Sequence, residues 1–149
     1  KKLSETELDA IVLFNRYYSP DIDLEKMRIT SSKVLSNPND LTLSLRWVAL
    51  MANRVSCDLG ASTGVHDGQA AIKQLLAGAT TVQMASALYL HGPEYIKTVH
   101  EEIEQWMDKN HYEDINKIRG RLSYDKAVNP ADYERVQFIK NFRNYVMKR

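Results

Sequence analysis

Two short apolar runs, separated by a segment with helical periodicity, form the clearest pattern along the chain. The runs 55–59 and 80–84 have the length and composition of buried strands. Between them, segment 67–77 places its apolar residues on one side of a helix, and Gly78 follows where helices commonly end in glycine. These apolar residues are Ala71, Ile72, Leu75 and Leu76. A strand, a helix and a strand in this order predict a right-handed βαβ unit with parallel strands.

The segments before this unit predict further elements. The continuous apolar run 9–14 has the character of a buried parallel strand, and the segment 16–39 is predicted to be a long loop. A helix is expected from Asn39 or Asp40 to about Asn53. Its predicted buried face consists of Leu43, Trp47, Leu50 and Met51.

The last third of the chain predicts three more helices. The first begins at Gly92-Pro93, with proline near its first position. Its buried stripe is expected to consist of Ile96, Val99, Ile103 and Trp106. A short helix is predicted over 114–119, and a final one over 131–147, so that 126–149 forms a C-terminal helical extension.

Small residues follow both strands of the βαβ unit, at Thr63-Gly64 and at Ala85-Ser86. Because the carboxyl ends of parallel strands meet at one edge of a sheet, both turns are expected side by side. Their backbone N–H groups, with the positive end of the helix that starts near Asp67, suit a phosphate dianion. A bulky side chain in either turn would occupy the space of the phosphate. The alternative is a pair of tight turns without a ligand; His66 either contacts the phosphate or lies at the surface.

The stretch TGVHDGQAAIKQLLAGATTVQMASALY, residues 63–89, resembles the FMN-phosphate segment of the dihydroorotate dehydrogenase family. In that family a Gly-Gly-Val turn opens a helix, and a Val-Gln-x-Gly-(Thr/Ser)-Ala-Leu turn follows the next strand. The likeness continues through HGPEYIKTVHEEIEQWMDKNHYEDINKIRGRL and covers roughly residues 9–123. It implies an α/β fold, the C-terminal part of a (β/α)8 TIM barrel with about strands six to eight.

The resemblance also implies a cofactor and its ligands. The cofactor is FMN, and the residues expected to hold it are Thr63, Gly64, Ala85, Ser86, Ser36 and Asn37. Asn15 is expected to contact a planar pyrimidine substrate; by its position alone, it could equally cap a strand-to-loop turn. The family's glycine-rich segment before the next helix is replaced here by Leu35-Ser36-Asn37-Pro38, a departure that concerns the substrate more than the cofactor.

No catalytic residue is assigned to this segment. In the family, the cysteine or serine that removes the substrate proton comes from an earlier loop of the barrel. Cys57 lies inside a predicted strand, so we interpret it as a buried small hydrophobic residue. A complete barrel needs about 250 residues, and the chain has 149. We therefore interpret residues 1–149 as the C-terminal half of a single FMN-binding domain, inactive by itself, with the N-terminal half as its partner.

The implied function is the oxidation of dihydroorotate to orotate in pyrimidine biosynthesis by an FMN-dependent oxidoreductase, expected to be a homodimer. Two alternatives stay open: a barrel that keeps the phosphate site without redox activity, and a related flavoenzyme that acts on another pyrimidine. Arg16, beside Asn15 in the altered loop, could pair with a carboxylate of the substrate.

Composition adds few constraints. The net charge of +1 gives no reason to expect nucleic acid or an anionic membrane as a partner. No run approaches the roughly 20 apolar residues of a membrane span, and a single cysteine fits a reducing compartment. The four histidines lack metal-ligand spacing, so no metal is predicted. A cytoplasmic location is expected.

Overall fold

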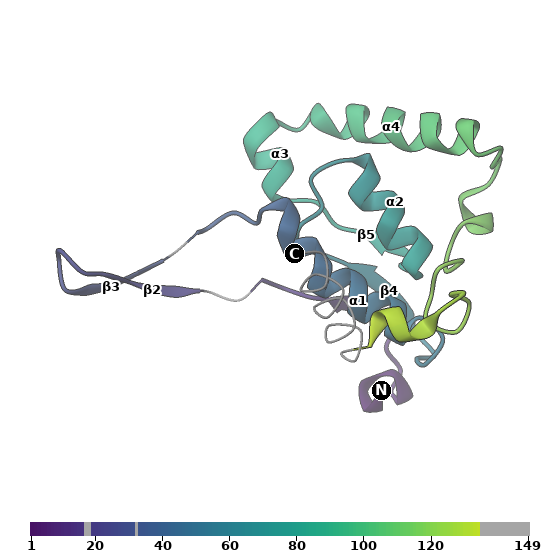
Figure 1. The fold of residues 1–149 in the computed structure, drawn as a ribbon, viewed down its shortest axis with the longest axis horizontal. Helices are drawn as coiled ribbons and strands as arrows, with labels where there is room; N and C mark the ends of the chain where they lie inside the picture. Colours follow the sequence, from purple (N-terminus) through teal and green to yellow (C-terminus); the bar gives the residue numbers. More distant parts are fainter. Residues whose placement is uncertain (17–18, 32, 135–149) are drawn as a thin grey trace, which may run out of the picture.

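The computed structural model describes residues 1–16, 19–31 and 33–134. Its centre is a three-stranded sheet in the order β1-β4-β5, formed by β1 (Ala10–Leu13), β4 (Asp58–Ala61) and β5 (Thr81–Val82) (Figure 1). Both pairings are parallel, and β1 matches β4 from Ala10↔Asp58 to Leu13↔Ala61. The parallel βαβ arrangement predicted from the sequence is therefore confirmed.

The described chain also contains four α-helices and four 3-10 turns. The helices are α1 (Leu41–Met51), α2 (Gly68–Ala77), α3 (Ser86–His91) and α4 (Tyr95–Lys109). The 3-10 turns are η1 (Lys2–Glu5), η2 (Pro38–Asp40), η3 (Ile115–Lys117) and η4 (Pro130–Tyr133). Helix α2 lies between α1 and α4 and packs against both (Figure 1).

The predicted strand bounds need correction. Strand β4 begins at Asp58, which lies opposite Ala10, the first residue of β1. The N–H of Asp58 donates to the carbonyl of Asp9, just before β1, at 2.9 Å. Cys57 therefore precedes the strand at its amino end, and it is half-buried rather than buried. Strand β5 is shorter than predicted, although the N–H of Gln83 still donates to the carbonyl of Ala61 at 2.8 Å.

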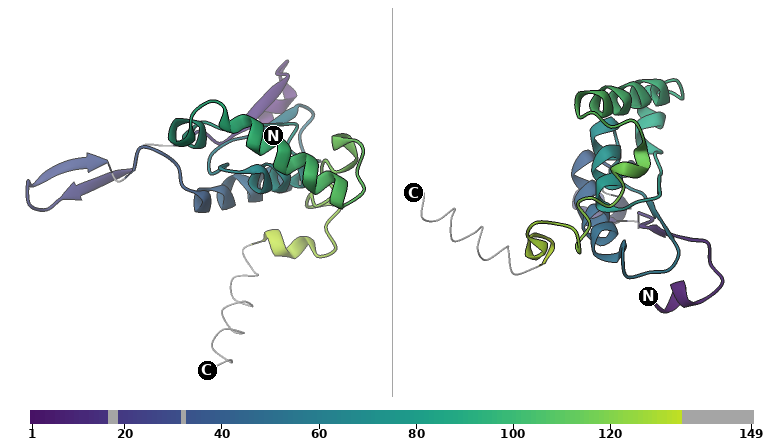
Figure 2. Two further views of the ribbon diagram at one scale, coloured as in Figure 1. Left: turned by 90° about the horizontal axis from the view of Figure 1, so that it is seen from above. Right: turned by 90° about the vertical axis from the view of Figure 1, so that its right-hand side faces the viewer.

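The segment predicted as a loop contains an antiparallel hairpin. Its strands are β2 (Pro20–Asp23) and β3 (Arg28–Ser31), and Ile22 lies opposite Ile29. The hairpin projects away from the helices and the sheet (Figures 1 and 2). Its turn contains neither glycine nor asparagine, the residues by which such turns are recognised in a sequence. Met27 takes the left-handed conformation there, at φ +47°.

Helix α1 buries a different face from the predicted one. Leu43 is 58% exposed and Trp47 39% exposed, so neither belongs to the core. The buried side consists of Leu41, Ser44, Val48 and Ala49. Ser44 is tolerated there because its hydroxyl donates to the carbonyl of Leu13 at 2.6 Å.

The elements after β5 agree with prediction only in part. Helix α4 is present and buries Val99, but Ile96 in the same predicted stripe is 38% exposed. The stretch expected to be a link before α4 contains the short helix α3, and the short helix expected over 114–119 is the 3-10 turn η3. Of the predicted final helix, only η4 falls within the described chain; residues 135–149 lie outside it.

A glycine at the start of α2 allows α4 to pack closely against this helix. A Cβ atom added to Gly68 would lie 2.5 Å from the Cβ of Glu102, so only glycine permits this approach. The N–H of Gly68 donates to the Glu102 carboxylate at 2.6 Å. Gly78 ends α2 at φ +121°, as its position predicts. In the part of the chain that the structure describes, no helix has the length and apolar character needed to cross a membrane.

Candidate functional site

The three strands of the central sheet end at one edge, where a cavity of about 200 Å³ opens. It is lined by Asn15, Arg16, Val34, Ser36, Ser62, Thr63, Gly64, Val65, Gln83, Met84, Ala85 and Ser86. The fold thus brings together, from four separate segments, all of the predicted site residues except Asn37. Val65, Gln83 and Met84 were not predicted, although each adjoins one of the two small-residue turns.

The turn after β4 is shaped by two successive left-handed residues. Thr63 has φ +76° and Gly64 φ +77°, and the Thr63 hydroxyl donates to the carbonyl of Phe14 at 3.0 Å. A Cβ atom at Gly64 would lie 2.1 Å from the backbone nitrogen of Leu41. The start of α1 therefore demands glycine here, a reason that the sequence did not reveal.

Two N–H groups at the start of α2, the helix end predicted to face a phosphate, are bonded to side chains of the chain itself. Asp67 accepts a hydrogen bond from the N–H of Ala70 at 2.7 Å, and Glu102 accepts one from the N–H of Gly68. The chain's own carboxylates thus already occupy donors of the first turn. By contrast, Gly64 is buried, and its N–H has no hydrogen-bond partner among the described residues. Buried N–H groups are almost always paired, so the unpaired N–H of Gly64 is a candidate donor for a ligand. Further donors must come from the turns and from side chains.

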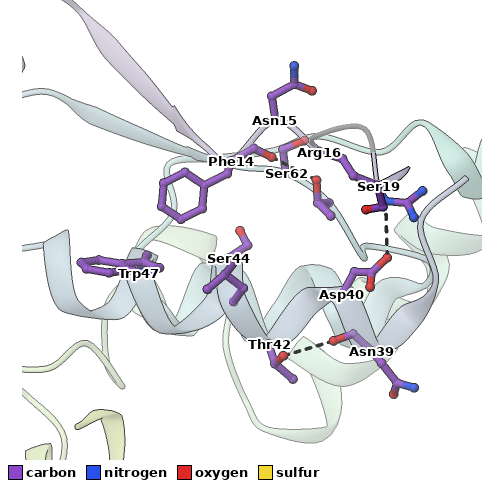
Figure 3. Close-up of a pocket in the computed structure, with 12 residues that line it drawn as sticks. Phe14, Asn15, Arg16, Ser19, Asn39, Asp40, Thr42, Ser44, Trp47 and Ser62 are labelled. Carbon is purple, nitrogen blue, oxygen red and sulfur yellow. Dashed lines mark hydrogen bonds and ion pairs between the residues drawn. The ribbon is translucent and has the colours of Figure 1, made fainter. Parts of the chain in front are cut away.

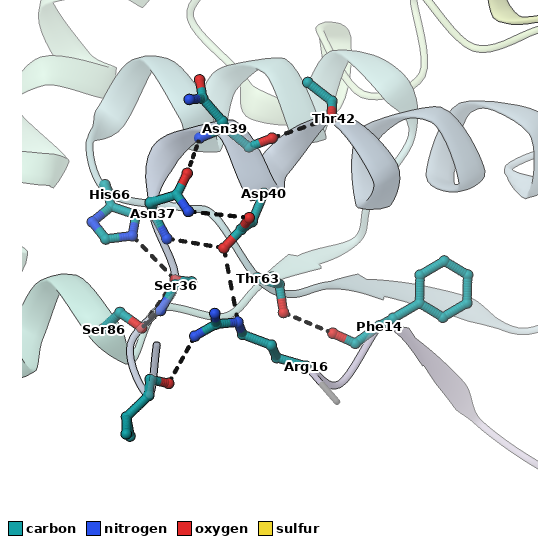
Figure 4. A network of polar contacts seen from close by, with 11 residues as sticks. Phe14, Arg16, Ser36, Asn37, Asn39, Asp40, Thr42, Thr63, His66 and Ser86 are labelled. Atoms are coloured by element: carbon teal, nitrogen blue, oxygen red, sulfur yellow. Dashed lines mark hydrogen bonds and ion pairs between the residues drawn. The ribbon is translucent and has the colours of Figure 1, made fainter. Parts of the chain in front are cut away.

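Hydroxyl groups supply such donors at the second turn (Figure 4). The backbone N–H of Ser36 and its Oγ both donate to Oγ of Ser86, each at 2.9 Å. Oγ of Ser36 lies 3.1 Å from Nε2 of His66. His66 therefore neither lines the cavity nor lies free at the surface; it contacts a serine that lines the cavity.

Asn37 and Arg16 hold the backbone next to the contacts of Ser36 with Ser86 and His66. Asn37 caps η2: its side chain accepts from the N–H of Asn39 at 3.0 Å, and its own N–H donates to Asp40 at 3.0 Å. Nη1 of Arg16 donates to the carbonyl of Val34 at 2.8 Å, and its Nε lies 3.8 Å from the Asp40 carboxylate. Both contacts tie the segment around residue 36 to the start of α1.

A larger cavity of about 620 Å³ lies beside the first and shares four of its residues (Figure 3). Its apolar wall comes from Phe14, Leu43 and Trp47. The rings of Phe14 and Trp47 meet edge to face, with centroids 6.3 Å apart. Asn15, at the mouth of both cavities, points away from α1 (Figure 3). The helical pattern had placed Trp47 in the core, which is why this wall was not predicted.

No group of three or more His, Cys, Asp or Glu side chains that could hold a metal ion is found in residues 1–16, 19–31 and 33–134.

Comparison with known proteins connects this geometry to one family. The family model for dihydroorotate dehydrogenase matches residues 1–107. The catalytic subunit of dihydroorotate dehydrogenase B (NAD(+)) from Alkaliphilus oremlandii is 35% identical over 117 residues, which make up 76% of this chain and 38% of that protein. Dihydroorotate dehydrogenase A (fumarate) from Lactococcus lactis is 39% identical over 59 residues, 40% of this chain and 19% of that one.

Solved structures support the fold. The crystal structure of DHODH from Eimeria tenella in complex with ferulenol superposes with a TM-score of 0.63 at 21% identity, covering 78% of this chain and 32% of that chain. The expected fold, part of a TIM barrel, is thereby confirmed. The chain spans about two-fifths of the length of the curated dihydroorotate dehydrogenase B relatives, 38% and 41% for two of them. By the match of the family model over most of its length, the chain belongs to the dihydroorotate dehydrogenase family.

Proposed function

We propose that this chain provides the FMN-phosphate site of a cytoplasmic FMN-dependent oxidoreductase that oxidises dihydroorotate to orotate in pyrimidine biosynthesis. The observation that carries the proposal is the cavity of about 200 Å³ at the carboxyl ends of the strands. It joins the turns at Thr63-Gly64 and Ala85-Ser86, and it adds the hydroxyl of Ser36.

The residues of this cavity fit a phosphate group. Gly64 is buried and its N–H lacks a partner among the described residues, while the hydroxyls of Ser36 and Ser86 line the same cavity. Donors of this kind hold phosphate oxygens without a full positive charge. When bound, FMN would accept a hydride from the substrate; the protein's part is to bind and orient both molecules.

Asn15 is the proposed substrate contact. It lies two residues after the end of β1, is exposed, and lines both cavities. A side-chain amide offers a donor and an acceptor, which matches the alternating donors and acceptors of a pyrimidine edge. A second candidate is a related flavoenzyme that acts on another pyrimidine; it is favoured by the altered loop, in which Leu35-Ser36-Asn37-Pro38 replaces the family's glycine-rich segment.

The proposed partner is the N-terminal half of the barrel, with the whole assembled as a homodimer. Strand β1 lies at the edge of the sheet, and the apolar wall of the larger cavity is beside it. Unpaired strand edges and exposed aromatic side chains are stabilised when further strands and helices cover them. The proposed partner would cover both and would supply the catalytic base.

The test is the visible spectrum of the chain, purified together with its complementary half, before and after addition of dihydroorotate. Flavin absorption that bleaches would support the proposal. Flavin absorption that persists would favour another pyrimidine. A protein that cannot be loaded with FMN would leave only a phosphate-binding barrel without redox activity.

A matched pair of variants links this readout to the cavity. Ala85→Leu places a large side chain in the cavity and should abolish FMN retention. Gln69→Leu adds a leucine to an exposed position of α2, outside both cavities, and should retain FMN. Equal flavin content in the two variants would argue against this cavity as the FMN site.

A further inference from the structure

Three polar side chains from separate segments form a continuous hydrogen-bonded series at the phosphate cavity. His66 precedes α2, Ser36 precedes α1, and Ser86 begins α3. Nε2 of His66 lies 3.1 Å from Oγ of Ser36, and Oγ of Ser36 donates to Oγ of Ser86 at 2.9 Å (Figure 4). Pairs that are 30 and 50 positions apart in the sequence are thus in direct contact.

The chemistry of hydroxyl groups gives this series a direction. A serine hydroxyl has one hydrogen to donate and can accept two hydrogen bonds. When Ser86 donates its hydrogen to a ligand, Ser36 must donate to Ser86; toward His66 it can then only accept, which selects the tautomer of His66 with a hydrogen on Nε2. Ser86 accepts from both the N–H and the Oγ of Ser36. Its acceptor capacity is filled, and its own hydrogen remains to be donated.

That hydrogen has no acceptor among the described residues, and Ser86 lines the cavity. The N–H of Gly64 is unpaired among the described residues, whereas two other groups of nearby donors are already engaged. Arg16 is held by Val34 and Asp40. Donors at the start of α2 are held by carboxylates. In this arrangement the Ser86 hydroxyl can donate to an incoming ligand oxygen.

We propose that His66, Ser36 and Ser86 form a directed relay that donates a hydrogen bond from Ser86 to an oxygen of a phosphate monoester. In this relay His66 is a positioning residue: it acts through Ser36 and does not touch the ligand. Successive hydrogen bonds polarise one another, so a donor at the far end strengthens the bond at the near end. The proposal rests on the proposed function, in which the cavity holds the phosphate of FMN.

The experiment compares FMN with riboflavin, which has the same ring system but no phosphate. Their dissociation constants are measured by flavin fluorescence quenching on the chain purified together with its complementary half, and on the same complex carrying each variant. His66→Ala should weaken the binding of FMN by about 3- to 10-fold, the effect of one hydrogen bond. It should leave the dissociation constant of riboflavin unchanged. His66→Gln keeps an N–H donor and should recover most of the loss. The control His100→Ala, at an exposed position of α4, should change neither constant.

Loss of FMN and riboflavin affinity in equal proportion would overturn the relay, because the effect would then not concern the phosphate. An unchanged FMN constant in His66→Ala would overturn it as well. Calorimetric titration with inorganic phosphate separates the relay from the proposed function. If the chain binds neither flavin but binds phosphate more weakly in His66→Ala, the FMN proposal fails and the relay holds. If phosphate binding is absent or unaffected by the substitution, the relay is wrong.

Discussion

Gly64 offers the sharpest test of how the site is built. It follows the left-handed Thr63 and has φ +77° itself. A Cβ atom at this position would lie 2.1 Å from the nitrogen and 2.6 Å from the Cα of Leu41. These are backbone atoms at the start of α1, so no side-chain rotation can relieve the overlap. Gly64→Ala should force the turn and the helix apart.

The expected loss of stability has two parts. The left-handed conformation costs an alanine about 1–2 kcal/mol. Forcing an extra methyl group into a packed region costs typically about 1–3 kcal/mol, so the free energy of unfolding should fall by about 2–5 kcal/mol in total. Gly120→Ala is the matched control: φ is +69°, but the nearest atom to its Cβ is 3.7 Å away. Gly120→Ala should lose only the cost of the left-handed conformation, about 1–2 kcal/mol.

The measurement is urea unfolding followed by far-ultraviolet circular dichroism, with wild type and both variants under the same conditions. The difference between Gly64→Ala and Gly120→Ala isolates the overlap with α1 from the backbone conformation. Equal losses would mean that α1 moves away at little cost. The reasoning that the start of α1 demands glycine would then be refuted.

Three further results are expected. Asp67→Ala should lower the free energy of unfolding by about 0.5–2 kcal/mol by removing the α2 cap, whereas Asp67→Asn should retain most of it, as urea unfolding would reveal. Ile118→Ala should lower the free energy of unfolding by about 2–5 kcal/mol, because Ile118 is fully buried. Ile96→Ala should lower it much less, because Ile96 is 38% exposed. In a pull-down titration, Trp47→Ala should weaken binding of the complementary N-terminal half by about 10-fold or more, while the 85%-exposed Tyr89→Ala should not.

The βαβ unit and its two turns could be predicted because their signals are local. Helical spacing on α2, the capping Gly78 and the small residues after each strand all act within a few positions. Parallel pairing then places both turns at one edge of the sheet. The contact of Ser36 with Ser86 is different in kind, since no spacing rule connects residues 50 positions apart; the resemblance, rather than any pattern, brought Ser36 to the site.

The hairpin and the buried face of α1 could not be predicted for physical reasons. A hairpin turn is recognised by residues that favour positive φ, and Met27 is not one of them. On α1, periodicity favours large apolar residues as the buried set, but the sheet accepts Ser44 because a strand carbonyl satisfies its hydroxyl. Counting hydrophobic side chains cannot anticipate a polar group whose partner comes from another element.

The errors in the predicted core are not scattered. Helix α2, packed between its neighbours, buries Ala71, Ile72 and Leu75 as predicted, each at most 5% exposed. The predicted core residues that are exposed lie on the flanking helices and on the edge strand: Leu43 and Trp47 on α1, Ile96 on α4, and Val12 on β1, which is 43% exposed although the run 9–14 was predicted to be buried. A pattern that holds in the middle and fails at both flanks is expected if the sequence encodes burial against elements beyond these flanks. The wall formed by the half-buried Phe14 and the exposed Leu43 and Trp47, beside the edge strand β1, is therefore the surface on which the proposed N-terminal half would close the barrel.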